Sequence, residues 1–217
     1  MRQTTDVSRR ALVKGALALG ASAVIVGGVT APRRALASGE SPAVDGANAD
    51  VQYGFLVYAS KCVNCEKCVA ACRQGNGLSD DTPDRRRITV VSNDKGGELS
   101  VSTSCMHCAQ PSCMRVCPAG AISKGSHGIV SVDTDRCIGC KYCYQACPYD
   151  VPRYNTVAMD KCDCCLGAGV APGETPYCVS ACIFNALKYG PLEELKEQEP
   201  DAVVIASIND PSCLVRG

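Results

Sequence analysis

Short runs of alternating apolar and polar positions mark this chain. Residues 53–62, YGFLVYASKC, read as a strand that runs into a cysteine, and residues 128–133, GIVSVD, alternate as a half-buried strand does. The segments RRITVVS and ELSVSTS, at 86–92 and 98–104, predict a β-hairpin joined by residues 93–97. The pattern therefore predicts several short strands.

The C-terminal part carries a different pattern. Residues 192–198, LEELKEQ, predict a short amphipathic helix with an acidic, solvated face. Residues 199–217 are expected to form either a short strand or a docking tail.

The first 37 residues differ from the rest. The paired Arg9 and Arg10 precede a weakly apolar stretch rich in Ala, Gly and Val, and residues 35–37, ALA, form a small-x-small site. This arrangement resembles a twin-arginine export signal. We therefore expect cleavage, and a location in the periplasm or at the outer face of the cytoplasmic membrane. The alternative is an uncleaved anchor, which Lys14 and the glycines disfavour.

The composition is rich in cysteine and poor in large aromatic residues. The 217 residues include 18 Cys, two Phe and no Trp, so the ordinary apolar core is expected to be small. Bound metal could supply folding energy instead. Outside residues 1–37 the chain carries 16 basic and 21 acidic side chains, a net charge of −5. That balance argues against nucleic acid as a partner.

Most of the cysteines fall into four quartets. In chain order these are Cys62, Cys65, Cys68 and Cys72; Cys105, Cys108, Cys113 and Cys117; Cys137, Cys140, Cys143 and Cys147; and Cys162, Cys165, Cys178 and Cys182. Two cysteines are left over. We interpret Cys164 as a packing residue or an alternative ligand, and we assign no role to Cys213.

The spacing within a quartet is typical of iron–sulfur chemistry. Three cysteines at steps of three can wrap a loop around one face of an iron–sulfide cube, and the fourth, expected at the start of a helix, reaches a second cube. Pro118 and Pro148 follow two of the fourth cysteines and turn the chain away. Zinc and disulfides are the alternatives, but zinc sites use paired cysteines with a long gap, and disulfides would be cramped at this spacing.

The motifs resemble two known families of iron–sulfur protein. CPAGAI, a strand and DRCIGC resemble the bacterial two-cluster ferredoxin. As a whole, residues 51–198 resemble the four-cluster electron-transfer subunit of molybdopterin oxidoreductases, through CMHC..P.C...CP, CIGCKYCYQACPYDVPRYN, and KC..C with a delayed cysteine pair. Ile183 departs from the pattern, since proline is usual there. The resemblance implies an α+β fold of two ferredoxin-like units, one inserted in the other. Its expected parts are a signal at 1–37, a linker at 38–50, an outer unit at 51–85 and 155–198, an inner unit at 86–154, and a tail at 199–217.

The same resemblance implies which cysteines share a cluster. We name these groups sets I to IV. They are set I, Cys62, Cys65, Cys68 and Cys182; set II, Cys162, Cys165, Cys178 and Cys72; set III, Cys105, Cys108, Cys113 and Cys147; and set IV, Cys137, Cys140, Cys143 and Cys117. Because all sixteen cysteines are present, we expect four [4Fe–4S] clusters.

Five basic residues and one histidine lie beside the predicted ligands. Positive charge there could raise cluster potentials, but we interpret the basic residues as solvated surface charges: Lys61, Lys67, Arg136, Lys141 and Lys161. His107 is expected to support a cluster loop or to be exposed, since its neighbours complete the ligand set.

Nothing in the sequence indicates a substrate site. It contains no phosphate-binding loop after a strand and no nucleophile motif, so we expect a non-catalytic subunit. The resemblance implies an electron relay between a molybdenum or tungsten pterin subunit and a membrane quinone-linked subunit. One alternative is a relay from quinol to a multihaem cytochrome, whose four-cluster proteins also carry their own export signal. Another is a solitary storage or structural iron–sulfur protein.

Overall fold

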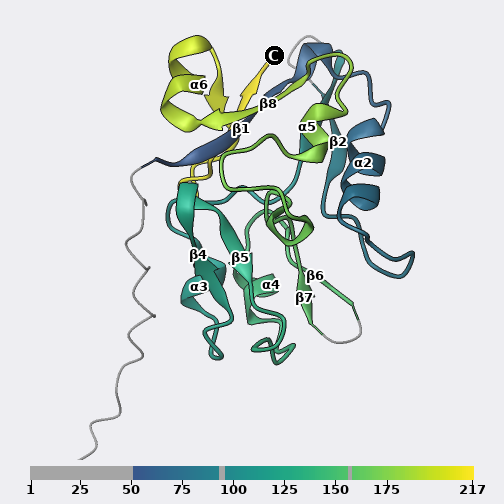
Figure 1. The fold of residues 1–217 in the computed structure, drawn as a ribbon. Coiled ribbons are helices and arrows are strands. Elements are labelled where there is room, and N and C mark those ends of the chain that lie inside the picture. Colours follow the sequence, from purple (N-terminus) through teal and green to yellow (C-terminus); the bar gives the residue numbers. More distant parts are fainter. Residues whose placement is uncertain (1–50, 93–95, 156–157) are drawn as a thin grey trace, which may run out of the picture. The chain divides into compact units, whose positions relative to one another are not determined.

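The largest element of the fold is a four-stranded sheet. The structure is a computed structural model that describes residues 51–92, 96–155 and 158–217, so the predicted signal and linker lie outside the described residues (Figure 1). The strand order is β8-β1-β10-β9, with β1 at Tyr53–Tyr58, β8 at Leu187–Pro191, β10 at Cys213–Arg216 and β9 at Val203–Val204. Strand β1 pairs antiparallel with β8 and parallel with β10.

The central strand β1 is buried on both faces. Because successive side chains of a strand point to opposite faces, Phe55 and Val57 join one core cluster and Leu56 and Tyr58 another. Helix α6, at Leu192–Gln198, covers the second face through Leu195, and Figure 1 shows it beside β1 and β8. The first face, with Phe55 and Val57, packs against the cysteine-rich part of the chain.

Three two-stranded ladders accompany the sheet. Strands β2, Arg87–Ser92, and β3, Glu98–Thr103, pair antiparallel and confirm the predicted hairpin. Strands β4, Ile122–Lys124, and β5, Val130–Val132, pair around the 3₁₀ turn η2, Ser126–Gly128, which confirms the strand predicted in GIVSVD. Strands β6, Arg153–Tyr154, and β7, Met159–Asp160, form the third ladder.

The helices next to the cysteines are short. Helix α2 spans Lys67–Gly75, α3 Ser112–Arg115, α4 Tyr142–Ala146 and α5 Tyr177–Ser180, and two 3₁₀ turns, η1 and η3, span Ala59–Lys61 and Leu166–Ala168. Figure 1 shows α3 and α4 in the same part of the fold as β4 and β5.

The expectation that each fourth cysteine begins a helix is wrong. Helices α3, α4 and α5 contain the third cysteine of their quartets and end before the fourth, and α2 contains both. Proline disfavours helical backbone in the residue before it, so Pro118 and Pro148 keep Cys117 and Cys147 outside a helix. Cys147 is accordingly extended, with φ −87° and ψ 114°.

Other predictions fit the observed fold. The described part is α+β, and residues 192–198 form the predicted helix. Of the two alternatives for the C-terminal segment, the structure has the strand, because β10 lies between β1 and β9. Across the described ranges, none of the helices combines the length and apolarity that a membrane crossing requires.

Candidate metal centres

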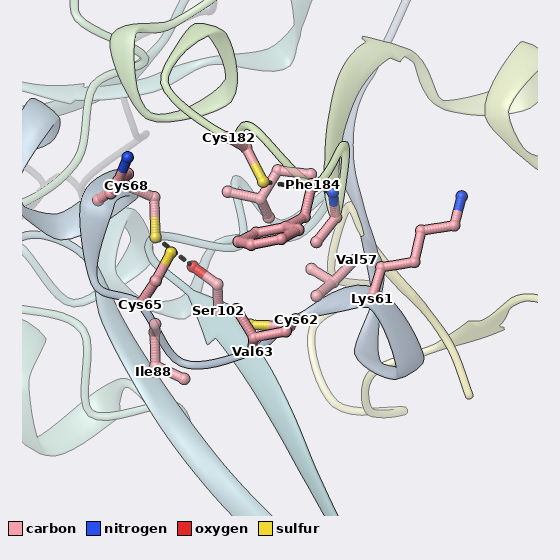
Figure 2. A pocket seen from close by; sticks show the side chains of 13 residues that line it. Val57, Lys61, Cys62, Val63, Cys65, Cys68, Ile88, Ser102, Cys182 and Phe184 are labelled. Carbon is pink, nitrogen blue, oxygen red and sulfur yellow. Dashed lines mark hydrogen bonds between the residues drawn. The ribbon is translucent and has the colours of Figure 1, made fainter.

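The four cysteines of set I line one pocket. Cys62 and Cys65 come from the loop between η1 and α2, Cys68 comes from the first turn of α2, and Cys182 comes from the turn after α5 (Figure 2). The pocket has an empty volume of about 360 Å³. Most of the remaining wall is apolar, from Val57, Val63, Ile88, Phe184, Ala186 and Leu187.

The cysteines of set IV line a second pocket of similar size. Its empty volume is about 310 Å³, and Ile122, Ile138 and Met159 lie in its wall. The Tyr154 hydroxyl lies 3.0 Å from the sulfur of Cys143, and the Ala121 N–H donates to Cys117 Sγ at 3.3 Å. The Met159 N–H donates to Cys137 Sγ at 3.5 Å, so set IV combines four sulfur atoms with hydrogen-bond partners at three of them.

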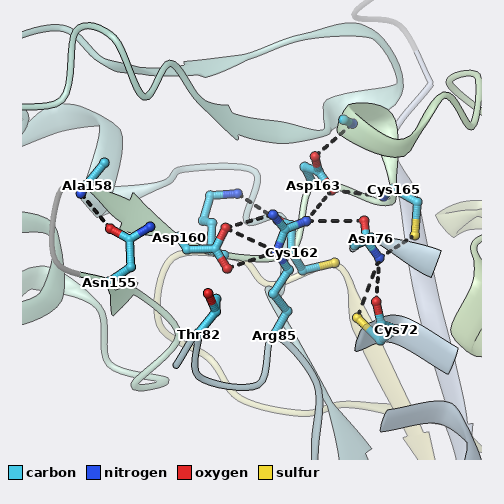
Figure 3. A network of polar contacts seen from close by, with 12 residues as sticks. Cys72, Asn76, Thr82, Arg85, Asn155, Ala158, Asp160, Cys162, Asp163 and Cys165 are labelled. Carbon is cyan, nitrogen blue, oxygen red and sulfur yellow. Dashed lines mark hydrogen bonds and ion pairs between the residues drawn. The ribbon is translucent and has the colours of Figure 1, made fainter. Parts of the chain in front are cut away.

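All four cysteines of set II are buried. Burial raises the pKa of Cys72 to about 12, and the thiolates of Cys162 and Cys178 contribute in the same direction. The amide of Asn76 donates to Cys165 Sγ at 3.4 Å and lies 3.8 Å from Cys72 Sγ (Figure 3).

A polar network holds the set II loop in place. Arg85 donates to Asp160 at 2.7 Å and to Asp163 at 3.3 Å, and it also reaches the Asn76 side-chain oxygen at 3.2 Å (Figure 3). Asp163 in turn accepts from the backbone N–H of Cys165 at 3.0 Å. The Arg85 guanidinium therefore orients both the loop that carries Cys165 and the Asn76 amide that faces the sulfurs of set II.

The cysteines of set III also interact with one another. Burial raises the pKa of Cys108 to about 12, and the thiolates of Cys105, Cys113 and Cys147 raise it further. Burial and the Cys105 thiolate likewise raise the pKa of Cys113 to about 12. Only the thiolate binds a metal, so a cluster at this site would displace the thiol protons, and the bound cations would remove the cost of the charge that these thiolates carry.

The four C-x-x-C loops share an unusual backbone position. The residue before the second cysteine has positive φ in every loop, at 54° for Asn64, 42° for His107, 65° for Gly139 and 57° for Cys164. Left-handed backbone is uncommon outside glycine and gathers at functional sites. It also forms the amide nests that bind anionic iron–sulfur centres. This repeated feature fits iron–sulfur clusters at the four sets.

The leftover Cys164 is one of these left-handed residues. Its sulfur lies 3.3 Å from His107 Nε2, while the N–H of Val130 donates to His107 Nδ1 at 3.0 Å. The ring proton therefore sits on Nε2 and points at Cys164. A hydrogen bond from Cys164 holds the pKa of Cys162 below its usual value, and burial opposes this effect. His107 is buried, so it supports the cluster loops from inside the protein.

The interpretation of the basic residues as surface charges is wrong for Lys161. Lys161 is 4% exposed, and its ammonium group donates to the carbonyls of Val130 and Cys162, whereas Lys61, Lys67, Arg136 and Lys141 are exposed. The cation also interacts with the thiolates of Cys105 and Cys162, from sets III and II.

Sequence reasoning missed the residues that support the sulfurs. Arg85, Arg86, Asn76, Ser102 and Tyr154 are brought to the cysteines by the fold from other segments. The run of three arginines at 85–87, at the start of β2, could have drawn attention to Arg85 and Arg86, but such charged runs are usually exposed to solvent.

Comparisons with known proteins agree with this chemistry. A family model described as a 4Fe-4S dicluster domain matches residues 98–192. The B subunit of anaerobic dimethyl sulfoxide reductase from Escherichia coli K12 is 39% identical over 169 residues, which cover 72% of this protein and 82% of the relative. The protein belongs to this family of iron–sulfur electron-transfer subunits.

Two other relatives have a similar sequence identity to this protein. The thiosulfate reductase electron transfer subunit PhsB of Salmonella typhi is 40% identical over 153 residues, covering 68% of this protein and 80% of the relative. Protein NrfC of Escherichia coli K12 is 37% identical over 153 residues, with 66% and 67% covered. The assignment of individual cysteines to individual clusters stays a prediction.

Proposed function

We propose that this chain relays electrons through four [4Fe–4S] clusters held by sets I to IV. It would connect a catalytic subunit carrying a molybdenum or tungsten pterin with a membrane quinone-linked subunit, as part of an exported complex. Bound clusters supply one-electron transfer, and the protein tunes their potentials through hydrogen bonds to sulfur, nearby charge and exposure.

The observation that carries the proposal is the distribution of exposed cysteines. Cys65 in set I and Cys140 in set IV are exposed, whereas every cysteine of set II is buried. A relay needs accessible centres at both ends and shielded ones between them, and a storage protein has no such requirement.

Contacts between sets support a linear order from I to IV. Helix α2 carries Cys68 of set I and Cys72 of set II, which a helix separates by about 6 Å along its axis. The thiolate of Cys162 in set II interacts with Cys105 of set III. In the proposed assignment, Cys117 joins set IV and Cys147 joins set III, so each of these two quartets gives one ligand to the other's cluster. Helices α3 and α4, which end just before Cys117 and Cys147, contact each other.

Exposed apolar side chains surround both outer sets. Beside set I, Val63 is 58% and Phe184 44% exposed, and beside set IV, Ile138 is 68% and Tyr142 61% exposed. Exposed apolar groups next to accessible centres suit docking of redox partners at the two ends. The likeness to a dimethyl sulfoxide reductase subunit supports a reductase complex as the source of these partners.

A relay to a multihaem cytochrome is the second candidate. It is favoured by the likeness to NrfC together with the predicted export signal on this chain.

Native purification under anaerobic conditions separates the two candidates. Iron, molybdenum, tungsten and haem are counted on everything that co-purifies with the chain. We expect about 16 irons per chain, together with a large subunit that contains molybdenum or tungsten. A haem partner would select the cytochrome relay, and iron without any redox partner would contradict both.

A further inference from the structure

Arg86 is a buried cation without a carboxylate partner. It is 1% exposed, and none of the ion pairs among the described residues includes it. Its Nη1 donates to the Ser102 carbonyl at 3.2 Å, and its Nη2 donates to Ser104 Oγ at 2.9 Å. Its Nε has no hydrogen-bond partner among the described residues. A buried charge is costly unless something of opposite sign compensates it.

Cysteine sulfurs from two sets face Arg86, and they carry the opposite charge once they bind a cluster as thiolates. Burial alone would lower the pKa of Arg86, but Cys178 and Cys162 of set II and Cys68 of set I outweigh it, and the net shift is upward. The guanidinium carbon also lies 4.8 Å from the centre of the Phe55 ring. Arg86 therefore lies where the negative charge of sets I and II converges.

Ser102 extends this arrangement to one sulfur. Arg86 Nη1 donates to Ser102 Oγ at 3.1 Å. Ser102 Oγ in turn lies 3.3 Å from Cys68 Sγ, and Figure 2 shows these two side chains facing each other. A hydroxyl oxygen that accepts from a guanidinium keeps its own proton free for another acceptor. The Ser102 proton is thus directed at Cys68.

We propose that Arg86 is the shared counter-ion of the two clusters held by sets I and II, and that Ser102 passes part of its effect to Cys68. The inference rests on the proposed function, since it requires clusters at both sets. Reduction adds one electron and one negative charge to a cluster. A fixed buried cation favours the reduced form over the oxidised form, and the potential rises. No proton moves, because arginine remains protonated.

Burial is what distinguishes Arg86 from the other cations near set I. Lys67 lies between the ligands Cys65 and Cys68 and lines the set I pocket, but its side chain is exposed. Water and salt screen an exposed charge, whereas a buried charge acts in a medium of low dielectric constant. Lys67 therefore provides a matched control that differs in burial and not in sign.

Redox titrations of the complete, cluster-loaded protein test the proposal. The four midpoint potentials are followed by electron paramagnetic resonance, with dithionite as reductant. In Arg86→Met we expect two of the four reduction equilibria to fall at least tenfold, a shift of about 59 mV for one electron. Arg86→Lys should recover most of the shift. Ser102→Ala should lower only one potential, and Lys67→Met should change the potentials less than Arg86→Met.

Several outcomes would overturn the proposal. It fails if Arg86→Met moves no potential more than Lys67→Met does, or if it moves all four equally. Where Arg86→Met does not keep its clusters, Ser102→Ala decides, because it leaves the guanidinium in place, and four unchanged potentials there refute the proposal. A wild-type protein without four clusters would instead refute the proposed function.

Discussion

Replacing Arg85 by methionine should destabilise the protein through the set II loop. Arg85 is 15% exposed, and it pairs with Asp160 at 2.7 Å and Asp163 at 3.3 Å, which are 16% and 18% exposed. Two of its nitrogens donate to Asp160 in a bidentate arrangement, at distances from 2.7 to 3.1 Å. The substitution would leave two carboxylates without this cation, next to thiolates that are also negative.

The magnitude follows from this partial burial. Removing one partner of a fully buried ion pair costs about 3–5 kcal/mol, and hydrogen bonds to charged groups contribute about 1.5–3 kcal/mol each. Because the Arg85 site retains some exposure, we expect a loss of about 3 kcal/mol in the free energy of unfolding. For a chain of this size each kcal/mol moves the melting temperature by about 2–4 °C, so the expected decrease is roughly 6–12 °C.

Thermal unfolding of the cluster-loaded protein measures this effect. The scans are made anaerobically at one scan rate, and loss of cluster absorption is followed beside circular dichroism. Arg153→Met is the matched control, because Arg153 pairs at 2.9 Å with Asp150, which is 57% exposed. An exposed pair contributes about 0–1 kcal/mol. Equal melting temperatures for Arg85→Met and Arg153→Met would refute the reasoning.

Three further substitutions probe separate sites. Lys161→Met should lower two potentials in redox titrations, because the buried ammonium faces thiolates of sets II and III; an unchanged profile would contradict this. Tyr154→Phe should lower a single potential, since it removes the hydroxyl 3.0 Å from Cys143 Sγ, and a change in several would argue against a local hydrogen bond. Cys213→Ala should keep about 16 irons per chain, whereas Cys182→Ala should lose about four or leave a labile cluster; equal iron in both would count against set I.

The sequence predicted local features of the fold well. The spacing of the cysteines within a quartet is a local property, so the candidate ligands could be recognised from short stretches of the chain. The same holds for the hairpin of β2 and β3, whose two strands are consecutive. Helix α6 was predicted with its observed bounds, because its acidic face and Leu195 fall within two turns.

Features that depend on distant segments could not be predicted in this way. Strand β10 becomes a neighbour of β1 only through parallel pairing of Phe55 with Cys213. Arg86 and Lys161 are buried among residues that include distant cysteines, Cys178 for Arg86 and Cys105 for Lys161. Charged residues are usually exposed, which is why Lys161 was interpreted as a surface charge, but the fold buries it beside cysteine sulfurs.

The relay depends above all on sixteen cysteines that hold four clusters. The most direct test is an iron and acid-labile sulfide count on the anaerobically purified protein, combined with electron paramagnetic resonance of the fully reduced protein. The relay predicts about 16 irons and an equal amount of sulfide per chain, with a spectrum of interacting centres. About eight irons, or zinc in place of iron, would contradict it.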